Sequence, residues 1–153
     1  MRTSASNKNK RILAIDPGIA NTGWALKAGK EFCCGTLKTS PKDSFKDRFD
    51  YILTHFENDH YYYDTLVIED TFGGLVKTTG LLVGAFIGWL DPKELRLVPP
   101  AKWVTQMFGK ENNGKFKKCA LELAEKGGWC PDSQHAADAA AMLEWYLQYG
   151  KGK

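Results

Sequence analysis

The chain has 153 residues, 43% of them hydrophobic and 25% charged, a composition that fits one globular domain with its own core and excludes a disordered or fibrous chain. Its formal net charge of +3 is too small to indicate a nucleic-acid ligand by itself. The N-terminus is polar and basic, the apolar run at 81–90 is too short to span a membrane, and the four cysteines form no C-x-x-C pair. We therefore expect a cytosolic protein with reduced thiols and no membrane partner.

The first half of the chain predicts an arm, a strand meander and a helix. Residues 1–10 are rich in Ser, Asn and Lys and are expected to form a basic flexible arm. Strands are predicted at about 11–16, 21–28 and 31–37, with a tight turn at 29–30. Ser40 and Pro41 are the expected N-cap and first residue of the helix that follows, which carries apolar residues at helical spacing to Phe56.

The second half alternates strands and helices. This order after a meander predicts a mixed α/β sheet covered by helices, in one domain over 11–149, with a loose tail at 150–153. The helix at 75–90 is apolar nearly all round, so it is either fully buried or half-buried against a second copy. The predicted elements are a strand at 65–69, a helix at 75–90, a strand at 95–98, helices at 101–108 and 115–126 around a loop at 109–114, and an alanine-rich helix from a cap at Asp132 or Ser133 to about Tyr149.

Acidic residues end two of the predicted buried strands. Asp16 closes the first strand just before Pro17-Gly18, and Glu69 closes the strand at 65–69. If these strands are neighbours, both carboxylates lie at the same edge of the sheet. His135 and Asp138 are three residues apart at the start of the last helix, so they share one helical face. Taken singly, Asp16 also suits an ordinary turn and His135 an ordinary surface position.

A cluster of three carboxylates and one imidazole requires cations, because the carboxylates repel each other. Oxygen ligands with a single nitrogen suit Mg²⁺ or Mn²⁺ better than Zn²⁺. Two such ions per site would stabilise the attacking and leaving oxygens of a phosphoryl displacement. The alternative is a capped helix on which Asp138 meets a structural lysine.

Basic residues are concentrated in one later segment of the chain. Five lysines lie between 102 and 118, against the single acid Glu111. Such a basic segment, separate from the acidic strand ends, suits a polyanionic ligand that binds the lysines and also contacts a metal ion at the acids. The alternative for each lysine is an ordinary solvated surface position. The candidate DNA-binding lysines are Lys102, Lys110, Lys115, Lys117 and Lys118.

Three motifs in order resemble the RuvC family of Holliday junction resolvases. They are Ile15-Asp-Pro-Gly18 with Thr22-Gly-Trp24, Ile68-Glu69 with Phe72, and His135-Ala-Ala-Asp138-Ala. The resemblance runs from about residue 11 to 149. It implies an RNase H-like fold with a mixed five-stranded sheet flanked by helices, a homodimer, and metal-dependent nicking of four-way and branched DNA by paired symmetric cuts.

The resemblance also assigns roles to individual residues. Asp16, Glu69 and Asp138 match the metal-binding carboxylates of the family, and His135 stands where many members carry another Asp, which would favour Mn²⁺ over Mg²⁺. Lys115 matches a basic residue near the scissile phosphate. Phe72 matches an aromatic residue that stacks on unpaired bases, the alternative being a core position.

Two other functions remain compatible with the sequence. One is a less discriminating nuclease that acts on branched DNA, RNA–DNA hybrids or structured RNA. The other is a junction-binding protein with weak catalysis, because His135 replaces an acid. The resemblance places the protein in the cytosol of a bacterium or of a phage-infected host, and the residues identify no recombination helper protein.

Overall fold

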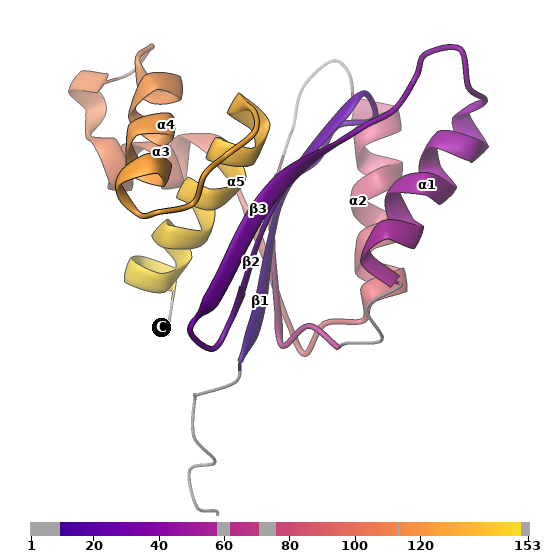
Figure 1. Ribbon diagram of the computed structural model, residues 1–153, viewed down its shortest axis with the longest axis horizontal. Coiled ribbons are helices and arrows are strands. Elements are labelled where there is room, and N and C mark those ends of the chain that lie inside the picture. Colours follow the sequence, from indigo (N-terminus) through magenta and orange to yellow (C-terminus); the bar gives the residue numbers. More distant parts are fainter. Residues whose placement is uncertain (1–9, 58–61, 71–75, 113, 151–153) are drawn as a thin grey trace, which may run out of the picture.

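A five-stranded mixed sheet forms the centre of the molecule in the computed structural model, which describes residues 10–57, 62–70, 76–112 and 114–150 (Figure 1). The strand order is β3-β2-β1-β4-β5. The first three strands form an antiparallel meander, and β4 and β5 are parallel to β1. The strands are β1 (Arg11–Asp16), β2 (Asn21–Ala28), β3 (Glu31–Lys38), β4 (Thr65–Glu69) and β5 (Glu94–Val98).

The two faces of the sheet are covered by different helices (Figure 1). One face carries α1 (Phe45–Glu57) and α2 (Val76–Leu90), and the other carries α3 (Pro100–Phe108), α4 (Phe116–Lys126) and α5 (Gln134–Trp145). Because both faces are covered, β1 and β4 are continuous apolar runs whose side chains alternate between two separate cores. The mixed α/β fold predicted from the sequence is confirmed.

The predicted helix boundaries hold within one or two residues except at the start of α1 and at the end of α5, where the α-helix ends at Trp145 and Tyr146–Gly150 forms a π-helical turn. The expected cap at Ser40 and helix start at Pro41 are wrong, because residues 41–43 form a turn and α1 begins at Phe45. Ser40 accepts a hydrogen bond from the Lys42 amide in that turn. The Ser44 hydroxyl instead accepts the Asp47 amide at 3.1 Å and donates to the Asp47 carboxylate at 2.6 Å, the reciprocal pattern of a capped helix start.

Helix α2 is half-buried. Leu82, Phe86 and Leu90 enter the core with α1. On the outer side Leu81 and Trp89 are 61% and 57% exposed. Within the described residues, no helix is both long and apolar enough to cross a membrane.

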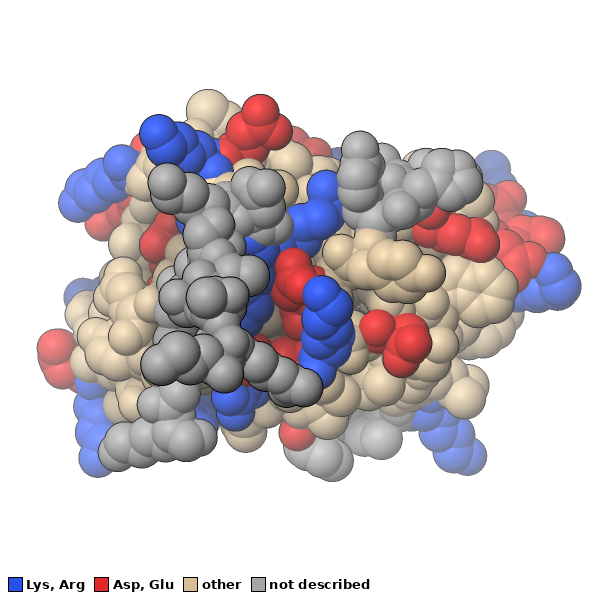
Figure 2. Space-filling model, turned by 90° about the horizontal axis from the view of Figure 1, so that it is seen from below, with Lys and Arg blue, Asp and Glu red and all other residues tan. Residues whose placement is uncertain are grey.

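Both signs of charge occur at the end of the molecule where β1 begins (Figure 2). Lys10 and Arg96 both pair with Glu94, at 3.2 and 2.8 Å, and Lys93 pairs with Asp64 at 2.7 Å. These ion pairs tie the starts of β1, β4 and β5 together. The acids at the opposite ends of β1 and β4 have no such lysine or arginine partner within 4 Å among the described residues.

Candidate active site

The parallel pairing of β1 with β4 brings Asp16 and Glu69 to the same edge of the sheet. Ile15 pairs with Ile68, so the next residue of each strand is the acid. The backbone turns away immediately after Asp16, and the buried Thr22 hydroxyl stabilises this turn by donating to the Gly18 carbonyl at 2.7 Å. The two carboxylates are thus fixed at the carboxyl ends of rigid, buried strands.

The start of α5 is anchored above this edge by β3. Thr36 donates through its amide and hydroxyl to the Asp132 carboxylate, at 3.2 and 2.7 Å, and its hydroxyl also contacts Ser133. Ser133 caps α5 by accepting the Ala136 amide at 3.2 Å. Of the two predicted caps, Ser133 is therefore the one used. These contacts fix where His135 and Asp138 enter the site.

Small residues let α5 lie directly on the sheet. A Cβ atom built at Gly23, the register partner of Asp16, would meet the His135 carbonyl oxygen at 2.1 Å. Only glycine therefore leaves room for the helix backbone at this point. The buried face of α5 is made largely of fully buried alanines, namely Ala136, Ala137, Ala139, Ala140 and Ala141.

Each of the three carboxylates is held by a different non-acidic side chain. His135 Nδ1 lies 2.9 Å from Asp16 Oδ2. The indole Nε1 of Trp103, a fully buried residue of α3, donates to Glu69 Oε2 at 2.9 Å. Gln134 donates to Asp138 Oδ1 at 2.7 Å. The carboxylates are thus oriented by partners that leave most of their negative charge uncompensated.

The Gln134 side chain also links the site to α4. Its amide nitrogen Nε2, which donates to Asp138, donates as well to the main-chain carbonyl of Lys117 at 2.9 Å. The Lys117 ammonium lies close enough to oppose the rise in the pKa of Asp138. A lysine of the basic segment is therefore part of the electrostatics of the site.

Crowding and burial shift the proton affinities of the site. Burial, reinforced by the charge of Asp16, raises the pKa of Glu69 to about 7. Burial likewise raises the pKa of Asp138 to about 6, although its hydrogen bond from Gln134 opposes the rise. The hydrogen bond to Asp16 raises the pKa of His135. The negative charge of the two carboxylates is therefore unfavourable in this site, and a bound cation would relieve it.

Three carboxylates and one imidazole are a set of ligands that fits a hard divalent cation. Their charges interact, since Asp16, Asp138 and His135 all influence the pKa of Glu69. Among the described residues, however, no three His, Cys, Asp or Glu side chains already form a metal-binding group. Asp16, Glu69 and Asp138 each point to their own hydrogen-bond partner instead. Binding an ion thus requires these side chains to turn toward one another.

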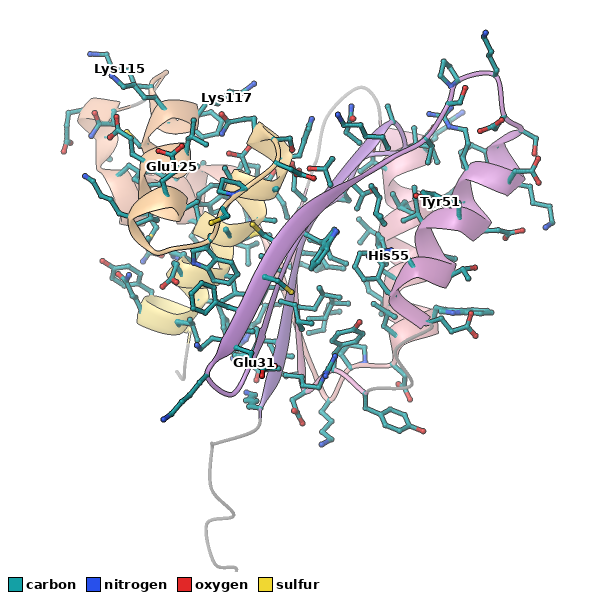
Figure 3. The ribbon with its side chains drawn as sticks, in the orientation of Figure 1. Glu31, Tyr51, His55, Lys115, Lys117 and Glu125 are labelled. Atoms are coloured by element: carbon teal, nitrogen blue, oxygen red, sulfur yellow. The ribbon has the colours of Figure 1, made fainter. Side chains whose placement is uncertain are left out.

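The predicted basic residues do not all lie at this site. In Figure 3, Lys117 extends from the first turn of α4 toward the end of α5 that bears the site, whereas Lys115, the N-cap of α4, extends away from α5. Lys118 is exposed and lies 3.8 Å from Glu122 on its own helix. Lys110 is exposed in a 3-10 turn at Lys110–Asn112, and Lys102 lies on α3. Phe72 lies outside the described residues.

Sequence reasoning missed Trp103 and Gln134 as parts of the site. Trp103 stands in an ordinary amphipathic helix, and no local pattern marks its indole as the donor to Glu69. Gln134 does carry a signal, because it lies four residues before Asp138, a spacing at which helical side chains meet.

Solved structures identify the fold class. The structure aligns with Thermus thermophilus RuvC in complex with a Holliday junction substrate, with a TM-score of 0.65 and 21% identity. The alignment covers 94% of this chain and 98% of the RuvC chain. A Fowlpox virus resolvase crystallised with Holliday junction DNA aligns with a TM-score of 0.55 and 13% identity, over 91% and 95% of the two chains. The protein therefore has the RNase H-like fold of these resolvases.

Part of the chain is also similar in sequence to curated proteins. The chain is 35% identical over 80 residues to the crossover junction endodeoxyribonuclease RuvC of Rickettsia typhi, and 34% identical to that of Rickettsia bellii. Each match covers 48% of this chain and 51% of the relative, so the matched part spans about half the length of the curated relatives. No family model matches the chain. The predicted resemblance to RuvC is confirmed.

The raised pKa values predict a metal-free protein that loses stability as the pH rises. Glu69, Asp138 and His135 each bind protons more tightly in the folded than in the unfolded chain. Their stabilising contribution is therefore present at low pH and is lost as the pH passes their folded pKa values. In chelator, the midpoint of urea unfolding should fall between about pH 5 and pH 7.5. Glu69→Gln should flatten this dependence, and an equal slope in this variant would contradict the assignment.

The Gln134 contacts predict a positioning role. Gln134→Ala removes the donor to Asp138 and the link to α4, so any metal-dependent activity of the site should fall about 10- to 100-fold. Gln134→Glu should lose at least as much, because it places a like charge beside Asp138. The measurement is kcat and KM separately, with the loss expected in kcat. Lys126→Ala, an exposed residue at the far end of α4, is the control. Unchanged kcat in Gln134→Ala would exclude the role.

Proposed function

We propose that this protein is a divalent-metal-dependent endonuclease that resolves DNA four-way junctions. The observation that carries the proposal is the meeting of Asp16 and Glu69 at one sheet edge beneath the start of α5. The fold it shares with solved junction resolvases, and its partial similarity to RuvC, support the same substrate.

Four side chains would hold two Mg²⁺ or Mn²⁺ ions, namely Asp16, Glu69, His135 and Asp138. When bound, the ions would neutralise the carboxylates, lower the pKa of a water molecule, and stabilise charge on the phosphodiester. His135 would serve as a neutral ligand, because the ring nitrogen that binds an ion cannot carry a proton. With one acid fewer in the set, Mn²⁺ should be at least as effective as Mg²⁺.

The chain's own residues would then orient the reaction. Trp103 and Gln134 each donate to one carboxylate oxygen of Glu69 and Asp138, and would restrain these side chains while the other oxygen binds an ion. Lys117, on the side of α4 that faces α5, supplies positive charge to the cleaved phosphate. Water attacks phosphorus and the 3′ oxygen leaves, so the ends are a 5′-phosphate and a 3′-hydroxyl. We assign Lys117 rather than Lys115 to this role, because Lys117 influences the pKa values of both His135 and Asp138.

We further propose that two copies pair through the outer side of α2. The exposed Leu81 and Trp89 lie on this helix, with Gly84 and Gly88, whose surroundings are open. Leu95 of β5, the edge strand, is 37% exposed. An apolar surface of this kind suits a symmetric contact, which would present two active sites to two strands.

Cleavage of a synthetic four-way junction labelled on each arm tests the function. Asp16→Asn, Glu69→Gln and Asp138→Asn should each lower the rate roughly 1,000-fold, because each removes charge needed to hold the ions. Junction binding in chelator should persist, since the fold and the lysines remain. Full cleavage by all three variants would reject the proposal. Equal cleavage of junctions, forks and RNA–DNA hybrids would instead indicate a less discriminating nuclease.

The proposed contact through α2 predicts a change in oligomeric state. Leu81→Glu combined with Trp89→Glu places two charges on the surface that would otherwise be buried, so the dimer should dissociate. Analytical ultracentrifugation measures the mass directly. Tyr51→Glu is the control, because Tyr51 is 54% exposed on α1, outside the proposed contact. A wild-type monomer, or a dimer unaffected by the double change, would contradict the contact.

A further inference from the structure

A groove lies beside β5, the edge strand next to the catalytic strands. Its volume is about 510 Å³. Residues 96–98 of β5 line it, together with Lys102 and Gln106 of α3 on one side. On the other side it is lined by Trp145, the last residue of α5, and by Tyr149 and Gly150 of the π-helical turn that follows. It therefore runs between two helices, along the outer edge of the sheet.

The groove begins next to the candidate active site. Val98, which lines it, is the register partner of Glu69 across β4 and β5. Lys102 lines the groove, and the adjacent residue Trp103 donates to Glu69. A strand held in the groove would thus continue from the metal-binding edge of the sheet.

Two cations line the groove. Lys102 is exposed and forms no ion pair with any described residue. Arg96 donates through Nε to Glu94 at 2.8 Å, yet its side chain remains 41% exposed. The negative charge of Glu94 is shared with Lys10 at 3.2 Å. The lining therefore keeps a positive excess, which suits an anionic ligand.

The remaining lining offers a hydrogen-bond donor and an aromatic face. Gln106 Oε1 accepts the indole Nε1 of the buried Trp145 at 2.7 Å, which leaves the two amide hydrogens of Gln106 as donors. Tyr149 is 53% exposed. Cationic groups beside an exposed aromatic ring are the features that hold phosphates and bases of an unpaired strand.

We infer that this groove binds a single strand of nucleic acid as it leaves the active site. Phosphates would lie against Arg96 and Lys102, and a base would stack on Tyr149. This inference extends the proposed function, because it supplies a place for one unpaired strand beside the cleaved bond. An acidic peptide would satisfy the cations and leave the ring of Tyr149 unused, so nucleic acid is the better match.

Binding of a fluorescein-labelled oligothymidine, measured by anisotropy in chelator, tests the groove without cleavage. Lys102→Ala and Tyr149→Ala should each weaken binding about tenfold, since a phosphate contact or a stacked base is lost. Lys102→Ala should also reduce the slope of log affinity against log salt by about one. The matched controls are Lys126→Ala, an exposed lysine of α4, and Tyr51→Ala, which is as exposed as Tyr149 but lies on α1.

The outcomes separate this inference from the proposed nuclease. Both test residues are exposed, and equal melting temperatures would confirm that the variants fold. If both variants bind oligothymidine as tightly as the wild type, the groove assignment is overturned. It is also overturned if a poly-glutamate peptide binds the protein as tightly as oligothymidine does and displaces it. A wild-type protein that binds oligothymidine through Lys102 and Tyr149 but cuts no junction with Mg²⁺ or Mn²⁺ would support the groove while rejecting the nuclease.

Discussion

The repulsion among carboxylates gathered at one edge of a buried sheet is the constraint on which the rest of this structure depends. The parallel register of β1 and β4 places Asp16 beside Glu69, and the close seat of α5 brings Asp138 toward both. An ordinary fold would separate or neutralise these groups, because burial makes their charge unfavourable. Among the described residues, the lysine and arginine ion pairs of the sheet instead lie at the other end of the strands, where Lys10, Arg96 and Lys93 are found. The molecule thus concentrates negative charge that no lysine or arginine of the described residues pairs with at this edge of the sheet.

The neutral partners of the acids explain how the site tolerates this charge before an ion binds. Trp103 and Gln134 donate hydrogen bonds and add no positive charge, so they orient Glu69 and Asp138 without competing with a cation for their charge. Asp16 differs, because its partner His135 can itself carry charge. A proton on the His135 imidazole would compensate the charge of Asp16, and a cation bound by Asp16 would do the same, so the two compete at this carboxylate.

Local patterns in the sequence were sufficient for the fold and for the acidic edge. The meander, the two strands that end in acids, and the capped alanine-rich helix follow from apolar runs, turns and caps that neighbouring residues specify. The start of α1 was misplaced because Ser40 and Ser44 both have the chemistry of a cap, and only the turn at 41–43 decides between them. The roles of Trp103 and Lys117 depend on how α3 and α4 pack against distant strands and helices. That orientation is a tertiary property, which no local pattern in the sequence contains.

The order of the elements along the chain has a consequence during synthesis on the ribosome. Asp16 and Glu69 emerge early, on β1 and β4, whereas α5 leaves the exit tunnel after both strands. Until α5 emerges, a nascent chain has neither Asp138 nor the helix backbone that packs against Gly23. A partly translated polypeptide therefore cannot assemble the complete set of acids. In this arrangement, the acids of β1 and β4 can meet Asp138 only in chains whose synthesis has passed α5.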